Sequence, residues 1–212
     1  MSDTATHWNA IYRSKDPTQV SWYQPHLARS LDLIARTGVG PDAHLIDVGG
    51  GASTLVDDLL MQEFRHLTVL DVSSKALGVS RARLGQQADA VTWNNSDITA
   101  AQLPRAYYDL WHDRAVFHFL TNAEDRRHYV ATMREALKPG GHAILATFAL
   151  QGPPRCSGLE VIRYSPDALH AELDGDFRLI EALDEAHQTP FHTVQQFMYC
   201  RFQRRMLAIG SE

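Results

Sequence analysis

The chain has 212 residues, 44% of them hydrophobic, and this length fits one domain that buries most of its apolar surface. A formal net charge of −5 without a Lys/Arg block argues against a nucleic-acid partner. There is no apolar signal core and no run of about 20 apolar residues, and two cysteines make no disulfide framework, so we expect a cytoplasmic protein without a membrane partner.

The first 24 residues combine a helical pattern with aromatic side chains. Trp8, Ile11 and Tyr12 recur at helical spacing within residues 3–13, and a polar stretch then ends in Trp22 and Tyr23. On one reading, this arm simply packs on the domain. On the other, it is a lid whose rings cover a cationic ligand, because aromatic faces attract cations.

A glycine turn follows the first predicted strand. Pro25 can start a helix that ends at Gly38, and residues 44–48 form an apolar strand. This strand runs into Asp47-Val48-Gly49-Gly50-Gly51-Ala52-Ser53, after which a helical pattern begins. Glycines let the backbone turn sharply and approach a ligand closely, and the free N–H groups of the next helix point toward that ligand. The spacing is not the full G-x-G-x-x-G, so the turn alone is weak evidence.

Two further carboxylates end the next two predicted strands. Strand 67–70 ends in Asp71, Ser73 or Ser74 caps a helix to about Leu84, and strand 90–94 leads to Asp97. An acidic residue about 20 positions after a glycine turn reaches the ribose hydroxyls of a nucleoside. Carboxylates at the ends of three successive strands therefore predict one nucleoside-binding edge.

Charged and imidazole side chains follow the fourth predicted strand. Residues 107–111 lead into His112, Asp113 and Arg114, which we place just past the carboxyl end of the strand, where ligands of open α/β sheets bind. We favour a functional site for Asp113 and Arg114 over an ion pair that only fixes the loop. We interpret His118 as a satisfied interior histidine.

The second half of the chain continues the α/β pattern and then departs from it. Helix 124–137 precedes an almost unbroken apolar strand at 142–148, and Ser165-Pro166 starts a later helix. Two strands, about 177–186 and 194–204, follow without a clear helix between them, and such neighbours are usually antiparallel. We predict an α/β, Rossmann-like fold with a mostly parallel seven-stranded sheet, a C-terminal antiparallel strand pair and helices on both faces.

The glycine turn and its carboxylates resemble those of the class I S-adenosylmethionine-dependent methyltransferases. The resemblance implies that Asp47 and Gly49 to Gly51 hold the methionine end of S-adenosylmethionine. It implies that Asp71 takes the ribose hydroxyls and that Asp97 with Ile98 takes the adenine. With the aromatic arm, the expected cofactor-binding residues are Trp8, Tyr12, Trp22, Asp47, Gly49, Gly50, Gly51, Ser53, Asp71, Val72, Asp97 and Ile98.

A narrower resemblance is carried by short motifs between residues 7 and 181. They are similar in order and approximate spacing to those of the thiopurine methyltransferase family and related thiol and halide methyltransferases. This resemblance implies that the arm aromatics lie over the cofactor and that the Asp-Arg pair lies by the cofactor and the substrate pocket. The motifs are Trp8-x3-Tyr12-x2-Lys15, Trp22-Tyr23-Gln24, Tyr108-Asp109, Asp113-Arg114, Asp125-Arg126, Tyr129 and Gly152-Pro153-Pro154.

A site that holds Arg114 together with His112 suits an anionic, soft nucleophile. A thiol with a pKa near 8.5 is already partly thiolate at about neutral pH, so it needs little help from a base. Our hypothesis is that Arg114 orients the anion, Asp113 fixes Arg114 or the amino group of the cofactor, and His112 contacts the substrate or assists proton removal. No spacing typical of metal ligands is present, and we expect no metal.

Several alternatives stay open. The leading hypothesis is a methyltransferase for a small thiol or chalcogen compound, treated as one domain over 1–212 with an arm (1–24), a cofactor-binding core (25–151) and a substrate loop with the last strands (152–212). A protein lysine methyltransferase and a non-catalytic module that binds S-adenosylmethionine are the alternatives, and a nicotinamide dehydrogenase fits poorly. Cys156 is more simply a loop cysteine. The sequence does not decide whether Cys156, His118, His187 or His192 lines the pocket. The oligomeric state also stays undecided.

Overall fold

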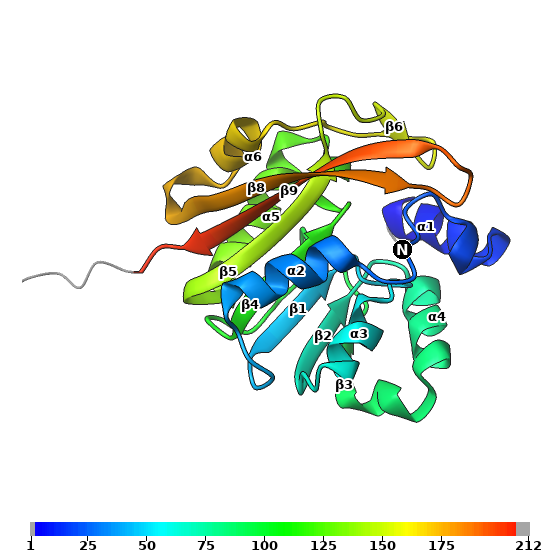
Figure 1. The fold of residues 1–212 in the computed structure, drawn as a ribbon, viewed down its shortest axis with the longest axis horizontal. Helices are drawn as coiled ribbons and strands as arrows, with labels where there is room; N and C mark the ends of the chain where they lie inside the picture. The colour runs from blue at the N-terminus through cyan, green and yellow to red at the C-terminus, as the bar shows by residue number, and fades with distance from the viewer. Residues whose placement is uncertain (1–2, 207–212) are drawn as a thin grey trace, which may run out of the picture.

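The computed structural model describes residues 3–206, and its centre is a seven-stranded sheet (Figure 1). The strand order is β3-β2-β1-β4-β5-β9-β8; the strands from β3 to β5 are parallel, and β9 runs antiparallel to both β5 and β8. This confirms the predicted mostly parallel sheet with an antiparallel pair at its end. The strands are β1 (His44–Val48), β2 (His66–Leu70), β3 (Val91–Asn94), β4 (Tyr108–Arg114), β5 (Leu137–Phe148), β8 (Phe177–Gln188) and β9 (Val194–Arg204), with a separate hairpin of β6 (Arg155–Cys156) and β7 (Leu159–Glu160).

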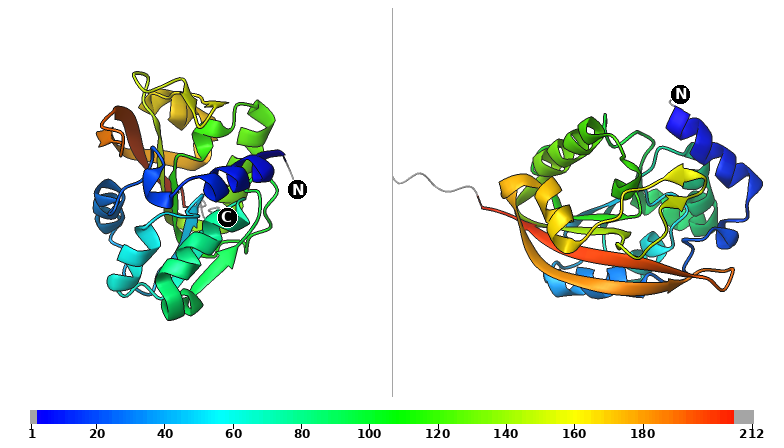
Figure 2. Two further views of the ribbon diagram at one scale, coloured as in Figure 1. Left: turned by 90° about the vertical axis from the view of Figure 1, so that its right-hand side faces the viewer. Right: turned by 90° about the horizontal axis from the view of Figure 1, so that it is seen from above.

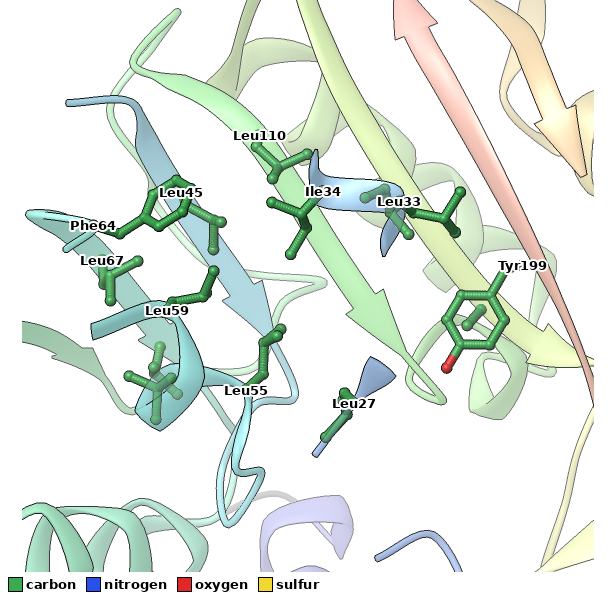
Figure 3. Close-up of a cluster of buried hydrophobic side chains, with 14 of the residues drawn as sticks. Leu27, Leu33, Ile34, Leu45, Leu55, Leu59, Phe64, Leu67, Leu110 and Tyr199 are labelled. Carbon is green, nitrogen blue, oxygen red and sulfur yellow. The ribbon is translucent and has the colours of Figure 1, made fainter. Parts of the chain in front are cut away.

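Helices cover both faces of the sheet because its buried strands carry apolar side chains on alternating sides. On β1, Leu45 packs in one core cluster with α2, α3 and α4, and Ile46 packs in the other with α5 and α6. Figure 3 shows part of the first cluster, with Leu33 and Ile34 of α2 beside each other and Tyr199 farther along the sheet. The helices are α1 (Asp3–Ser14), α2 (Ala28–Thr37), α3 (Leu55–Met61), α4 (Ser74–Leu84), α5 (Ala123–Ala136) and α6 (Pro166–Glu172).

Helix α1 lies across the end of the sheet where the parallel strands finish (Figure 2). Its Asn9 is buried, and its Oδ1 accepts hydrogen bonds from Ser73 Oγ (2.9 Å) and Lys75 N (3.1 Å) at the start of α4. Ser73 caps α4, as predicted, by accepting a bond from Ala76 N. The arm is therefore tied to the edge of the sheet at which the glycine turn lies.

Three element boundaries correct the sequence prediction. Strand β4 continues through Arg114, because β1 and β5 flank it and pair with Asp113 and Arg114. Strand β5 begins at Leu137 rather than His142, and a register shift against β4 accommodates its Pro-Gly-Gly segment. Helix α2 begins at Ala28 rather than Pro25. Within residues 3–206, we find no helix long and apolar enough to cross a membrane.

Candidate active site

A cavity of about 720 Å³ opens at the carboxyl ends of the parallel strands. Its size lies within the range of about 300–1,000 Å³ that is usual for small-molecule sites. The arm forms one wall, the ends of β1 to β4 form the floor, and apolar side chains from β5 and β9 form the far side. The lining includes Trp8, Tyr12, Trp22, Gly49, Asp71, Val72, Asp97, Ile98, Arg114, Phe119, Phe148, Cys156, Glu160 and Phe197.

The glycine turn is packed tightly against the protein itself. Gly49 has a positive φ of 71°, and a Cβ there would lie 2.0 Å from a methyl group of Val116. A Cβ on Gly50 would lie 2.3 Å from Asp47 Oδ2, and one on Gly51 would lie 2.4 Å from Asp71 Oδ2. Neighbouring side chains thus leave no room for a Cβ at any of the three glycines, and Gly49 also has a backbone conformation that favours glycine.

The turn borders two cavities. Gly49 lines both the large cleft and a small adjoining cavity of about 40 Å³, whereas Asp47, Gly50 and Ser53 line only the small cavity. Gly51 lines neither of them. The methionine-end residues expected from the sequence therefore gather at the junction of the two cavities, with Gly51 behind them.

Asp71 lies at the end of β2 with only 9% of the residue exposed. Its Oδ1 accepts a 2.7 Å hydrogen bond from Ser73 N, and a backbone bond from Gly51 also reaches this carboxyl. Burial raises the pKa of Asp71 to about 7, although these backbone N–H groups act in the opposite direction. Asp97, at the end of β3, also faces the cleft, and its Oδ1 accepts bonds from the amide and hydroxyl of Thr99.

The arm presents its aromatic side chains to the cleft. Trp22 Nε1 donates a 3.2 Å hydrogen bond to the hydroxyl of Tyr12, and the rings of Trp8 and Trp22 meet edge to face at 5.7 Å. Trp8 also contacts Phe119 edge to face at 5.1 Å. Burial raises the pKa of the Tyr12 phenol, so this hydroxyl stays protonated. The three aromatic residues expected to cover a ligand thus form one connected wall.

His112 does not reach the large cleft. The residue is 1% exposed; its Nδ1 lies 2.7 Å from Asp47 Oδ1, and its Nε2 lies 2.9 Å from Ser30 Oγ. Both ring nitrogens are therefore engaged beneath the glycine turn. This corrects the expectation that His112 contacts the substrate, which assumed that the strand had ended before it.

Asp113 points away from Arg114, because successive residues of a strand face opposite sides of the sheet. Its Oδ1 accepts a bond from Val116 N (2.8 Å), and its Oδ2 accepts bonds from Phe117 N (3.1 Å) and the Tyr129 hydroxyl (2.6 Å). Burial raises the pKa of Asp113 to about 6 despite these bonds. Of the two roles expected for Asp113, the contact with Arg114 is wrong. Asp113 instead binds the loop after β4, and it does not line the large cleft, where the amino group of a cofactor was expected.

Arg114 is a cation in the wall of the cleft. Its Nε donates to the Tyr199 hydroxyl (2.8 Å), its Nη1 donates to the Trp22 carbonyl (2.9 Å), and the guanidinium lies 4.5 Å from the centre of the Phe197 ring. The side chain is 6% exposed, and its Nη2 lies 3.9 Å from Glu185 Oε2, beyond hydrogen-bond distance. The positive charge is therefore held in place by the arm and the last strands.

The four residues left undecided by the sequence fall in different places. Cys156 lines the cleft, and burial raises the pKa of its thiol. His118 is fully buried, its Nδ1 accepts a bond from Phe148 N (3.1 Å), and burial lowers its pKa to about 3, which agrees with an interior histidine. His187 binds the Ser21 carbonyl through Nε2 (2.7 Å). Neither His187 nor His192 lines the cleft.

Sequence reasoning missed the apolar far wall of the cleft. Phe119, Phe148 and Phe197 come from segments up to about 80 positions apart, and nothing in their local pattern separates a cavity wall from ordinary core.

Among residues 3–206, no group of three metal-ligating side chains comes together.

Residues 46–143 match the family model of a methyltransferase domain. A solved structure from a study of the conversion of a disulfide bond into a thioacetal group during echinomycin biosynthesis superposes with a TM-score of 0.79 at 15% identity, covering 97% of this chain and 93% of that one. The N-methyltransferase NodS from Bradyrhizobium japonicum WM9, solved with S-adenosyl-L-homocysteine, gives 0.72 at 18% identity, covering 96% and 99%.

A curated relative adds a weaker similarity. EEF1A lysine methyltransferase 2 of Danio rerio is 21% identical over 158 residues, covering 68% of each chain. Together, the comparisons confirm that the architecture is the Rossmann-like methyltransferase fold predicted from the sequence.

Proposed function

We propose that this chain is an S-adenosylmethionine-dependent methyltransferase and that it transfers the methyl group to a small soft nucleophile, a thiol or another chalcogen compound. The observation that carries the proposal is the position of Arg114. A buried cation lies in a wall that is otherwise largely aromatic, between Trp22 and Phe197. Such a wall suits an acceptor that is apolar and becomes anionic at its reacting atom.

The residues of the cleft fit the cofactor. Asp71 and Asp97 offer carboxylates at neighbouring strand ends, and Ile98 is a buried apolar surface beside them. The arm adds aromatic faces that suit a sulfonium cation. At the glycine turn, Asp47 Oδ2 is buried with no hydrogen-bond partner within residues 3–206, so it is an acceptor open to a cationic group. We propose these positions, with Val72 and Ser53, as the cofactor site.

When bound, S-adenosylmethionine would supply an electrophilic methyl group, which a nucleophile can displace from the sulfonium sulfur. The task of the chain is then mainly to hold and align the partners. Arg114 stabilises the thiolate form of the acceptor, so the thiol loses its proton to solvent water before transfer. Asp113 holds the loop after β4 through its hydrogen bond with Val116 N. His112 contacts Asp47 under the glycine turn and does not contact the acceptor.

Two similarities support sulfur as the acceptor atom. The echinomycin structure, which covers nearly the whole chain, comes from a study of sulfur chemistry, the conversion of a disulfide into a thioacetal. The short motifs that resemble the thiopurine methyltransferase family point to the same class of acceptor. We therefore place the chain in that family as part of this proposal, as a single cytoplasmic domain over residues 1–212.

A protein lysine side chain is the second candidate acceptor. The curated relative is a lysine methyltransferase, and Asp3, Asp125 and Glu160 bring carboxylates to the cleft, where they attract a lysine ammonium. Arg114 opposes this reading, because a buried cation repels an amine that approaches as ammonium.

Calorimetric titration with S-adenosyl-L-homocysteine, followed by a screen with labelled S-adenosylmethionine, tests the proposal. The screen contains thiophenol, benzeneselenol, iodide, a primary amine and a lysine-rich protein. Transfer to thiophenol or benzeneselenol supports the proposal, and transfer to the protein alone supports the second candidate. Binding of S-adenosyl-L-homocysteine without any methyl transfer favours a module that senses the cofactor.

A further inference from the structure

A continuous chain of buried polar side chains runs beneath the cleft from Asp47 to Arg114. Asp47 Oδ1 lies 2.7 Å from His112 Nδ1, and His112 Nε2 lies 2.9 Å from Ser30 Oγ. The Ser30 side chain also hydrogen-bonds Tyr199, whose hydroxyl accepts a 2.8 Å bond from Arg114 Nε. These residues come from β1, β4, α2 and β9, so the chain joins strands on both sides of β4.

The chemistry of the two ends sets the direction of the bonds at those ends, and the hydroxyl groups between them can continue that direction. An arginine can only donate, and an ionised aspartate can only accept. Arg114 Nε–H therefore donates to Tyr199, whose hydroxyl proton is free to go on to Ser30. Ser30 then donates to His112 Nε2, and His112 Nδ1–H donates to Asp47. This order places a proton on His112 Nδ1 and leaves His112 Nε2 as an acceptor.

Each end keeps one buried polar atom without a hydrogen-bond partner in the part of the chain that the structure describes. These atoms are Asp47 Oδ2 and Arg114 Nη2. Both residues border the small cavity beside Gly49 and Gly50, and Arg114 also lines the large cleft. Under the proposed function, we assign the unused acceptor to the cofactor side and the unused donor, which also borders the large cleft, to the acceptor side.

We propose that Ser30, His112 and Tyr199 are positioning residues that couple the cofactor side of the cleft to the acceptor side. They hold a negative group under the glycine turn and a positive group beside the acceptor, with the hydroxyl dipoles between them aligned. Fixed dipoles of this kind stabilise charge without reorganising during the reaction. The inference rests on the proposed function, because it assigns the two ends to the two partners of methyl transfer.

Two single-atom or near-isosteric changes break the chain at different links. Tyr199→Phe removes the link to Arg114, and Ser30→Ala removes the link to His112. Tyr108→Phe is the matched control, because it removes a buried tyrosine hydroxyl, bonded to Thr68 at 3.5 Å, that lies outside the chain. Circular dichroism verifies that each variant is folded.

The first readout is the affinity for S-adenosyl-L-homocysteine by calorimetry. We expect Tyr199→Phe and Ser30→Ala each to weaken binding by about fivefold or more, as usual for coupled sites, and Tyr108→Phe to leave it unchanged. The double variant should be no weaker than the poorer single variant, because one break already disconnects the ends. Equal losses in all three single variants, no loss in any of them, or additive losses in the double variant would overturn the coupling.

The second readout does not depend on ligand binding. The ring ¹⁵N shifts of His112, assigned by their loss in His112→Asn, should show a protonated Nδ1 and an unprotonated Nε2 in the wild-type protein. A proton on Nε2 would overturn the direction of the chain. Absence of any affinity for S-adenosyl-L-homocysteine in the wild-type protein, with the expected tautomer, would instead remove the proposed function and with it the role of the chain in methyl transfer.

Discussion

The guanidinium of Arg114 donates a 2.9 Å hydrogen bond from Nη1 to the backbone carbonyl of Trp22. This bond joins the N-terminal arm to the fourth strand across 92 positions of sequence. Because Trp22 also donates to the Tyr12 hydroxyl, the cation that we assign to the acceptor also orders the aromatic wall that we assign to the cofactor. A change at Arg114 should therefore affect both the transfer reaction and the attachment of the arm.

Replacement of Arg114 with Gln should lower methyl transfer to thiophenol by about 100-fold, a usual cost of removing a group that stabilises charge in the transition state. The reason is that Gln keeps hydrogen-bonding capacity but has no charge to favour the thiolate. Initial rates with labelled methyl donor measure the effect. Arg65→Gln is the control, because Arg65 lies in an exposed ion pair with Asp42. Unchanged turnover in Arg114→Gln would remove the proposed role of this residue.

Replacement of Asp71 with Asn should weaken binding of S-adenosyl-L-homocysteine by about tenfold, because a charged acceptor is replaced by a neutral one. In the wild-type protein, the pKa of this carboxyl is raised to about 7, so affinity should rise between pH 6 and 8 as it ionises. Calorimetry over this range measures both effects, with the exposed Asp42→Asn as control. A variant that keeps the wild-type affinity and pH dependence would contradict the assignment of Asp71.

The same carboxyl should make the ligand-free protein less stable as pH rises from about 4 to 7. In this window the folded protein keeps a proton on Asp71 that the unfolded chain has lost, so the free energy of unfolding falls, by roughly 1 kcal/mol per pH unit. His118, with its pKa lowered to about 3, gives the opposite slope between pH 3 and 6.5. Urea denaturation of Asp71→Asn beside wild type isolates the first effect; parallel pH curves for the two proteins would rule it out.

Alanine at Gly50 should destabilise the fold by about 2 kcal/mol, the usual cost of overpacking a rigid site. The added Cβ would lie 2.3 Å from Asp47 Oδ2 and 3.0 Å from a methyl group of Val69. Gly78→Ala is the matched control, because a Cβ in this position of α4 meets nothing within 4 Å and alanine favours helix. Urea denaturation should show opposite signs for the two variants, and a neutral Gly50→Ala would mean that the turn can relax.

Much of this architecture could be predicted from local pattern. Residues 44–48 form the predicted strand without change, Ser73 caps the predicted helix, and Asp71 lies at the edge of the cleft. These features depend on interactions between neighbours in sequence or on the common direction of parallel strands. The same is true of Trp8 and Tyr12, whose helical spacing brings them to one side of α1 and into the cleft.

The direction of each side chain in β4 could not be predicted, because it depends on where the strand ends. Polar residues at 112–114 suggested a loop, yet pairing with β1 and β5 continues the strand through them. Once Arg114 is within the strand, it faces the cleft and Asp113 faces the opposite side. The partners of Arg114 and His112, Tyr199 and Ser30, come from β9 and α2, and no local pattern relates them.

Replacement of Trp8 with Ala should weaken binding of S-adenosylmethionine more than binding of S-adenosyl-L-homocysteine. The first carries a sulfonium cation and the second a neutral sulfur, and only the cation gains from the aromatic face; a difference of about fivefold between the two losses is expected. Calorimetry with both ligands measures it, and Trp8→Phe, which keeps an aromatic face, should recover most of the difference. Equal losses for both ligands would mean that Trp8, in edge contact with Trp22 and Phe119, acts only by packing the arm on the domain.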